Sequence, residues 1–145
     1  MIVIDTNVIS EPFKRRREQA VIDWLDRQAP ATLYLAAMSL AEVLTGLAIM
    51  PQGRSRQQLQ DGMQRLLHEK FADRILPFDE AAACAYAHIQ ANAKASGRHV
   101  GVADGVIAAI AMSKGFAVAT RDAQPYLAAG LQVIDPWQEA AGAKD

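Results

Sequence analysis

The stretch that decides the fold is Ile2-Val3-Ile4-Asp5-Thr6-Asn7, at the start of the printed sequence. Three apolar residues that end at an acid predict a short buried strand of a parallel sheet, with a carboxylate at its carboxyl end. Ligands of open α/β sheets bind just outside such strand ends, and the first strand is usually central. Asp5 is therefore a candidate site residue, although it could equally be a turn former completed by Thr6 and Asn7.

Downstream of this strand, short apolar runs alternate with longer helical patterns. The expected strands are 2–4, 33–36, 75–76, 116–119 and 132–134, and the expected helices are 18–28, 39–50, 55–70, 79–96 and 102–114. This alternation predicts one α/β domain over residues 1–145, with a central parallel sheet of about five short strands flanked by helices. The helices within residues 39–70 are expected to form a hairpin arm, and the last few residues, from Ala140, are expected to fray.

Three more acids, Glu42, Asp104 and Asp122, also fall where a strand ends or a helix begins. Acids at the carboxyl ends of parallel strands converge on one edge of a sheet, where they would repel one another without a cation. Ligands that are all oxygen indicate Mg²⁺, for which Mn²⁺ can substitute, because zinc prefers His or Cys. The histidines, at positions 68, 88 and 99, lack the spacing of a zinc site.

Each of these acids also has a simpler interpretation. Ser39 and Glu42 have the spacing of a capping box, Asp104 in a first helical turn would favour the helix dipole, and Asp122 could cap a short helical turn. For Asp104 the function is favoured, because small neighbours such as Gly105 are costly inside a helix unless something approaches closely.

The composition excludes several classes of protein. Half of the residues are hydrophobic (51%), which excludes disorder, and the apolar runs are too short for a membrane span. The lone Cys84 has no disulfide partner and is expected to be buried in a helix. This feature and the absence of a basic leader predict a cytoplasmic protein. The net charge of −1 means that contacts with nucleic acid would be local. The candidates for such contacts are Lys14, Arg15, Arg16, Arg17 and Arg121.

Four motifs in this order carry a family resemblance. They are Asp5-Thr6-Asn7, Ser39-Leu40-Ala41-Glu42, Val102-Ala103-Asp104-Gly105 and Ala119-Thr120-Arg121-Asp122. With them, the chain resembles a PIN-domain ribonuclease of the VapC toxin family. Three further stretches make it most similar to the FitB branch: Ile4 to Glu11, Leu76 to Asp79, and Pro136-Trp137.

The resemblance implies a Mg²⁺-dependent endoribonuclease toxin of a toxin–antitoxin pair, usually a homodimer. It further implies inhibition by a small DNA-binding antitoxin, of ribbon-helix-helix or similar fold. The pair would contact operator DNA only through this antitoxin. By matching position, Asp5, Glu42 and Asp104 take the core acidic places of the family, and Asp122 takes its more variable fourth place.

The mechanistic hypothesis is that the three core acids hold one Mg²⁺, while Asp122 helps a second ion or a water, and that metal-activated water hydrolyses an RNA phosphodiester. Thr6, Asn7 and Thr120 would orient these ligands. One alternative is a non-catalytic binding module whose acids are only caps. Another is a phospho-aspartate hydrolase that uses Asp5 as nucleophile, which Asn7 disfavours because such enzymes place a second Asp there.

Overall fold

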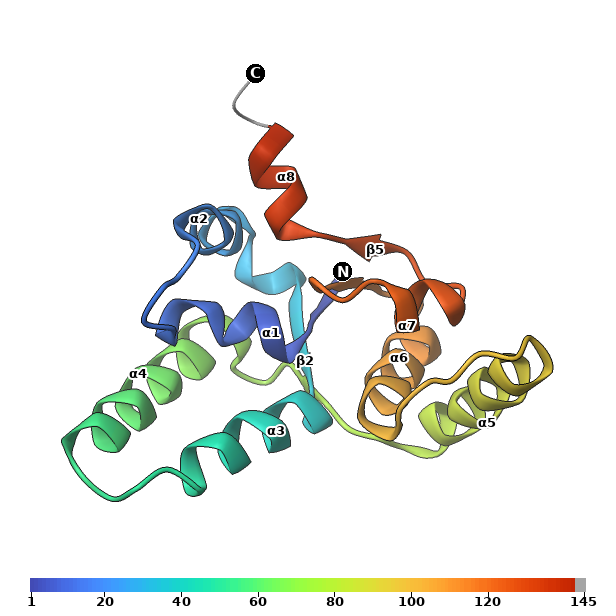
Figure 1. The fold of residues 1–145 in the computed structure, drawn as a ribbon, viewed down its shortest axis with the longest axis horizontal. Helices are drawn as coiled ribbons and strands as arrows, with labels where there is room; N and C mark the ends of the chain where they lie inside the picture. Colours follow the sequence, from blue (N-terminus) through green and yellow to red (C-terminus); the bar gives the residue numbers. More distant parts are fainter. Residues whose placement is uncertain (143–145) are drawn as a thin grey trace.

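The computed structural model describes residues 1–142 and contains a five-stranded parallel sheet (Figure 1). Its strands are β1 (Ile2–Ile4), β2 (Leu33–Ala36), β3 (Ile75–Leu76), β4 (Ala117–Ala119) and β5 (Val133–Ile134). The strand order is β3-β2-β1-β4-β5, and every neighbouring pair is parallel. The predicted α/β class, the number of strands and the central place of the first strand are confirmed.

Helices cover both faces of the sheet. They are α1 (Thr6–Ile9), α2 (Gln19–Arg27), α3 (Ala37–Ala48), α4 (Arg54–Phe71), α5 (Glu80–Ala95), α6 (Val102–Lys114), α7 (Gln124–Ala128) and α8 (Pro136–Gly142). Two single 3₁₀ turns occupy Glu11–Phe13 and Pro30–Thr32. In Figure 1, α1 to α4 lie on one side of the strands and α5 to α7 on the other. Right-handed crossovers explain this division, because the chain runs from β1 to one edge of the sheet and then returns to the other.

The core is divided in the same way, into two clusters separated by the sheet. Val3 and Val118 face the cluster formed with α5, α6 and α7, whereas the next residues, Ile4 and Ala119, face the cluster formed with α1 to α4. Successive side chains of a strand point to opposite faces, so β1 and β4 are buried on both sides. This explains why both strands read as continuous apolar runs in the sequence.

The predicted hairpin arm consists of α3 and α4, which lie side by side and are joined by residues 49–53 (Figure 1). Gly53 in this loop has a backbone φ of 153°, a value that residues other than glycine rarely adopt. Helix α3 starts at Ala37, two residues before the expected start, directly after β2. Ser39 is therefore inside the helix and fully buried, so the capping-box interpretation of Ser39 and Glu42 is wrong.

Helix α8 was not expected from the sequence, which predicted fraying from Ala140. The helix continues through Gly142, while residues 143–145 lie outside the described part. It packs against α2, where the indole nitrogen of Trp24 donates a hydrogen bond of 2.7 Å to Glu139.

The prediction that Cys84 is buried is wrong, because its side chain is exposed. Helix α5 buries Ala82, Ile89 and Ala93, and Cys84 lies two residues from Ala82, on the other side of the helix. Within the described residues, no helix has both the length and the apolar character that crossing a membrane requires.

Candidate active site

Asp5 lies at the carboxyl end of β1, where the strand order reverses. The chain continues from β1 to β2 on one side, and β4 adds on the other side, so the crevice for ligands is expected between the ends of β1 and β4. The backbone N–H of Asp5 donates to the carbonyl of Ala119 at 3.0 Å, which extends the β1–β4 ladder by one residue. Only 6% of Asp5 is exposed.

Both carboxylate oxygens of Asp5 accept short hydrogen bonds. The backbone N–H of Thr6 donates to Oδ1 and the hydroxyl of Thr120 donates to Oδ2, each at 2.7 Å. The first bond makes Asp5 the N-cap of α1, so the turn-forming interpretation holds in part. The second comes from the end of β4, 115 residues away, and serves no cap.

The Thr120 hydroxyl is the centre of a network of polar groups. It accepts hydrogen bonds from the side-chain amide of Asn7 at 3.3 Å and from the backbone N–H of Asp122 at 3.1 Å, while it donates to Asp5. The backbone N–H of Arg121 in turn donates to the side-chain oxygen Oδ1 of Asn7 at 3.4 Å. The loop after β4 is thus tied to the loop after β1.

Glu42 joins this network from the hairpin arm. It is exposed on α3, and its Oε1 accepts a hydrogen bond of 2.8 Å from the hydroxyl of Thr6. Thr6 therefore contacts Asp5 through its backbone and Glu42 through its side chain. Glu42 is thus tied to the first residue of α1, directly after Asp5.

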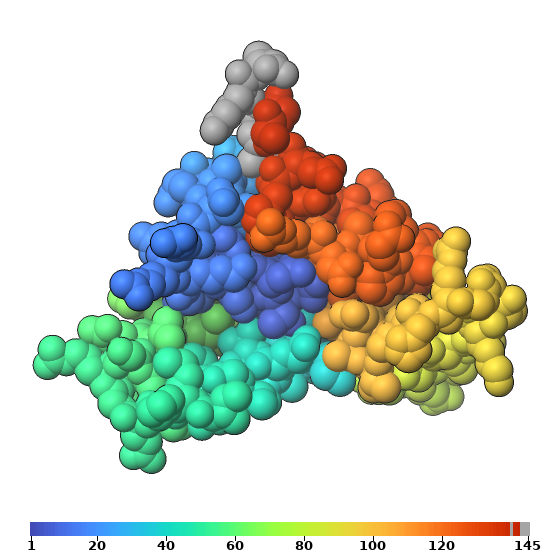
Figure 2. Space-filling view, in the orientation of Figure 1, coloured from blue at the N-terminus to red at the C-terminus, as the bar shows by residue number. Residues whose placement is uncertain are grey.

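Asp104 lies in the first turn of α6 and is partly buried. Burial raises the pKa of its carboxyl, and the charges of Asp5, Asp122 and Glu42 raise that pKa further. All four predicted acids therefore lie in one electrostatic neighbourhood. Figure 2 shows the segments that carry them meeting near the centre of one face.

The glycine beside Asp104 does not serve the acid site. A Cβ at Gly105 would come within 2.9 Å of both Tyr86 and Gln90, which belong to α5. The close approach that the sequence indicated is the packing of α5 on α6, so the argument from Gly105 to function was wrong. The proximity of Asp104 to the other acids is an independent observation.

Asp122 is exposed, and α7 begins two residues after it, with Ala123 as the cap residue and no side-chain capping bond. The capping interpretation of Asp122 is therefore wrong. Burial is the largest effect that raises the pKa of Asp5, and the charge of Asp122 raises it further, while hydrogen bonds from Thr120 and Thr6 and the nearby Tyr126 hydroxyl oppose that rise. Asp122 thus acts on Asp5 through space.

Although the four acids are neighbours, their side chains do not surround one point. Within residues 1–142, no three acidic, His or Cys side chains are arranged to hold a single metal ion. Asp5 is fixed by its two hydrogen bonds, whereas Glu42 and Asp122 are exposed. A shared ion would therefore require the exposed acids to reorient toward Asp5 and Asp104.

Tyr126 is a residue of this site that sequence reasoning missed. Its side chain is fully buried, and its hydroxyl makes no hydrogen bond of standard geometry. The hydroxyl is nevertheless close enough to Asp5 and Asp104 to lower the pKa of both carboxyls. The only sequence signal was its position one helical turn after Asp122, where an aromatic residue reads as ordinary core.

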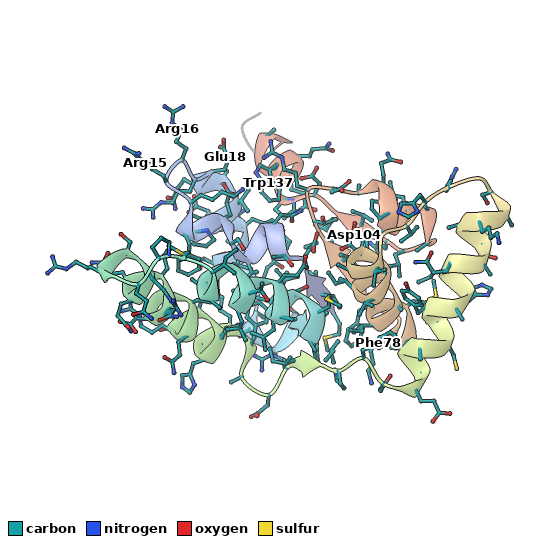
Figure 3. All side chains as sticks on the ribbon, turned by 60° about the horizontal axis from the view of Figure 1, so that its bottom comes forward. Arg15, Arg16, Glu18, Phe78, Asp104 and Trp137 are labelled. Atoms are coloured by element: carbon teal, nitrogen blue, oxygen red, sulfur yellow. The ribbon has the colours of Figure 1, made fainter. Side chains whose placement is uncertain are left out.

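Most of the predicted cationic contacts are engaged elsewhere. Lys14 forms an ion pair of 2.7 Å with the buried Glu11, and Arg121 lies over the ring of Trp137, with 5.3 Å between the guanidinium carbon and the ring centroid. Arg17 donates to the carbonyl of Pro12 at 3.3 Å. The exposed Arg15 and Arg16 point outward, away from Asp104 (Figure 3).

Two hollows flank the acids. The first, of about 280 Å³, lies between α1 and the hairpin arm and includes Thr6, Glu42, Phe13 and Met63 in its lining. The second, of about 400 Å³, lies beside Asp122 and is lined by Arg98, His99, Asp122, Gln124, Pro125 and Ala128. Glu42 thus borders a mainly apolar hollow, and Asp122 borders a hollow whose lining includes the polar side chains of Arg98, His99 and Gln124.

Comparison with known proteins identifies the family. The sequence pattern of the PIN domain matches residues 2–131. The chain belongs to the PIN-domain family. The parallel sheet described above is thus the sheet of a PIN domain, and the predicted family resemblance is confirmed.

Relatives of this PIN domain cover it almost completely. It is 49% identical to the VapC ribonuclease Y4jK of Sinorhizobium fredii, over 97% of this chain and 100% of the relative. It is 40% identical to the toxin FitB of Neisseria gonorrhoeae, over 96% of this chain and 100% of that protein. A solved structure of FitAB bound to the IR36 DNA fragment matches it with a TM-score of 0.89 and 42% identity, over 94% of this chain and 96% of that one.

Proposed function

We propose that this PIN domain is the toxin of a type II toxin–antitoxin pair and that it is a Mg²⁺-dependent endoribonuclease. The observation that carries the proposal is the placement of Asp5, which is buried at the reversal of strand order and interacts electrostatically with Asp104 and Asp122. The similarity to a VapC ribonuclease and to the toxin FitB supports the reaction class and the biological role.

The chemistry of the site fits a hard divalent cation. Its donors are carboxylate oxygens, and burial together with mutual repulsion raises the pKa of both Asp5 and Asp104. A bound cation would relieve that repulsion and hold both groups ionised. Asp5, Glu42 and Asp104 would hold a Mg²⁺ ion, or Mn²⁺ in its place, and Asp122 would assist a second ion or a water.

When bound, the metal would supply Lewis acidity and activation of water for attack on an RNA phosphodiester. The protein would supply the orientation. Thr120 fixes Asp5 from the end of β4, and Thr6 holds Glu42 against the end of β1. Asn7 has an amide that donates to Thr120 and no carboxyl, so it offers no acid or base for the alternative phospho-aspartate hydrolase.

RNA would cross the acids between the two hollows. Arg98 and His99 border the polar hollow, and Arg15 and Arg16 are free on the surface, so these side chains could attract the phosphate backbone. Lys14 and Arg121 are paired with Glu11 and Trp137, and contact with RNA would require them to leave these partners.

The proposed partner is a small DNA-binding antitoxin, of ribbon-helix-helix or similar fold. The toxin–antitoxin pair would bind operator DNA only through this antitoxin. The matched FitAB structure, which is bound to DNA, supports this assignment. An arginine of the antitoxin could pair with the acids in place of the cation. A homodimeric state and a cytoplasmic location complete the proposal.

The proposal is tested by RNA cleavage with purified protein in Mg²⁺ and in EDTA. We expect cleavage only with the metal, and a loss of at least about 100-fold in Asp5→Asn and Asp104→Asn. Asp23→Asn is the matched control, because it removes an equal charge from an exposed position on α2. Wild-type rates in both site variants would refute the assignment.

A second measurement separates this proposal from a non-catalytic binding module. A cation site stabilises the folded protein by mass action, by about 2.7 kcal/mol at a metal concentration 100 times the Kd. Urea unfolding with and without Mn²⁺ measures this stabilisation. If neither Mn²⁺ nor Mg²⁺ stabilises the wild-type protein, the acids do not form a metal site, and the module becomes the better explanation.

A further inference from the structure

We propose that the polar hollow, which Asp122 borders, is a nucleotide subsite that binds one single-stranded nucleotide of the RNA next to the bond that is cut. The phosphate of this nucleotide would contact Arg98 and His99, and its base would lie against Gln124 and Pro125. The inference rests on the proposed function and adds a substrate contact to it. Three observations carry it, and they concern the lining of the hollow, the backbone that presents Arg98 and His99, and the unpaired charge of Arg98.

The lining of the hollow combines the groups that a nucleotide requires. Arg98 and His99 come from the loop between α5 and α6, whereas Asp122 and Gln124 come from the segment between β4 and α7 and from the start of α7. The volume of about 400 Å³ lies within the range of about 300–1,000 Å³ for pockets that hold one small ligand. Because Asp122 belongs to the acid site, a nucleotide in this hollow would lie beside the proposed metal.

The hollow also has the surfaces that a base needs. Pro125 and Ala128 offer apolar surface to the face of a base, and the exposed amide of Gln124 offers an acceptor oxygen and two donor hydrogens to its edge. Proteins read RNA mostly in single-stranded segments, where unstacked bases can be contacted in this way. The subsite would therefore take a whole nucleotide and give the enzyme a sequence preference.

The backbone that presents Arg98 and His99 is fixed on both sides of them. The backbone N–H of Arg98 donates to the carbonyl of Ala93 at 2.8 Å, which closes the end of α5. Val100, directly after His99, is buried, and its carbonyl accepts a hydrogen bond of 3.1 Å from the side chain of Gln90. The two exposed side chains thus extend from a backbone that is already ordered, which reduces the entropy lost when they bind a ligand.

The charge of Arg98 is unpaired in the described part of the chain. The two ion pairs within residues 1–142 are formed by Lys14 and Lys70, so no carboxylate there holds the Arg98 guanidinium, although Asp122 lines the same hollow. A guanidinium binds phosphate through charge-assisted hydrogen bonds. Since the Asp122 carboxylate would repel a phosphate, we expect the phosphate on the side of Arg98 and the metal on the side of Asp122.

The test is the binding of short single-stranded RNA to inactive Asp5→Asn protein in Mg²⁺, measured by fluorescence anisotropy over a range of salt concentrations. Adding Arg98→Gln to this parent should weaken binding by about 3–10-fold for every RNA sequence. It should also lower the slope of log Kd against log salt concentration by about 0.7, the loss of one phosphate contact to a single strand. Urea unfolding checks that the variant remains folded.

Arg27→Gln is the matched control, because it removes an equal charge from the exposed last residue of α2. In Figure 1, α2 and the loop between α5 and α6 lie on opposite sides of the molecule. Salt screens exposed charges that are more than about 10 Å apart, so we expect a Kd within about twofold of the parent and an unchanged salt slope. An equal loss in Arg27→Gln and Arg98→Gln would mean that only net charge matters and would overturn the inference.

Gln124→Ala, also in the Asp5→Asn parent, tests the contact with the base. Arg98 stays in place, so the salt slope should not change. We expect the ratio of the Kd values for adenine-rich and uracil-rich or cytosine-rich RNA to change by about fivefold, the lower end of what one base contact discriminates. If these ratios are unchanged, the hollow contacts at most a phosphate, and the nucleotide subsite is overturned.

Failure of this inference can be distinguished from failure of the proposed function. If Arg98→Gln binds every RNA as tightly as its parent, the hollow is not a substrate subsite, while metal-dependent cleavage by the wild-type protein leaves the proposed function standing. If the wild-type protein cleaves no RNA in Mg²⁺ and the Asp5→Asn parent binds none, the proposed function fails first, and this inference fails with it.

Discussion

Replacing Thr120 with valine tests the physical link on which the acid site depends. The Thr120 hydroxyl donates to Asp5 at 2.7 Å, and both side chains are buried, with 0% and 6% exposed. Valine keeps the branched shape and removes the donor. Hydrogen bonds to charged groups contribute about 1.5–3 kcal/mol, and little water reaches this pair to replace the lost bond. We therefore expect Thr120→Val to lower the free energy of unfolding at pH 8 by about 2–3 kcal/mol.

The matched control is Thr6→Val, because the two hydroxyls make nearly the same bond in different surroundings. Thr6 donates to Glu42 at 2.8 Å, but Glu42 is exposed, so water can replace the hydroxyl. We expect this variant to lose less than about 1 kcal/mol. Urea unfolding in EDTA measures both variants without a contribution from metal.

The loss in Thr120→Val should also depend on pH. The pKa of Asp5 is raised from 3.8 on folding, so the folded protein binds more protons and its stability falls as pH rises from 3.8 through the folded pKa. The Thr120 bond opposes this rise, so its removal moves the folded pKa higher and deepens the fall. The difference between the two proteins should grow with pH across this window and then level off. A loss as small as that of Thr6→Val, or an equal loss at pH 4 and pH 8, would refute the reasoning.

Four other substitutions have distinct expected outcomes. Asp104→Asn should stabilise the metal-free protein above pH 3.8, because it removes a carboxyl whose pKa is raised on folding. It should also abolish stabilisation by Mn²⁺. Urea unfolding with and without metal measures both effects, and a variant less stable than wild type in EDTA would contradict the first. Gly46→Ala should raise the free energy of unfolding by about 0.5–1 kcal/mol, because alanine favours a helix and a Cβ there meets nothing within 4 Å. Gly105→Ala should lower the free energy of unfolding by about 1–2 kcal/mol, because its Cβ would be 2.9 Å from atoms of α5. Thermal unfolding that ranked the two variants in the other order would be contrary evidence. Arg121→Ala should cost about 0.5–1 kcal/mol from the lost stacking on Trp137, and an unchanged free energy of unfolding would show that this contact contributes nothing.

The sequence predicted the strands and the longer helices well because their ends are marked by local signals. Gly115 ends α6 in the left-handed conformation, and the Asp79 side chain caps α5 by accepting from the backbone N–H of Ala82. The start of α3 was missed because its local signal, Ser39 with Glu42, competed with a tertiary requirement. The strand β2 leads straight into the helix, and Ser39 is buried inside its first turn.

The candidate site was predictable only in outline. The acids could be found because strand ends converge in a parallel sheet, and three of the hydrogen bonds at the site come from the hydroxyl and amide groups expected to orient them, on Thr6, Asn7 and Thr120. The burial of Tyr126 beside the acids depends on the tertiary packing of α7, and no local pattern encodes that packing. For Gly105 the error was the opposite one. The close packing of α5 on α6 requires a glycine there, and the sequence argument attributed that requirement to the acid site.

The site and the core depend on the same strand register. Ile4 pairs with Ala119, so Asp5 and Thr120 follow side by side, and their side chains are joined by a hydrogen bond that spans 115 residues of sequence. A slip of one residue between β1 and β4 would separate this pair and also move apolar side chains out of both core clusters. The hydrophobic packing that fixes the register therefore fixes the distance between the acid and its donor. Although the raised pKa values of Asp5 and Asp104 show that the acids oppose folding at neutral pH, the two-sided burial of β1 and β4 holds them together.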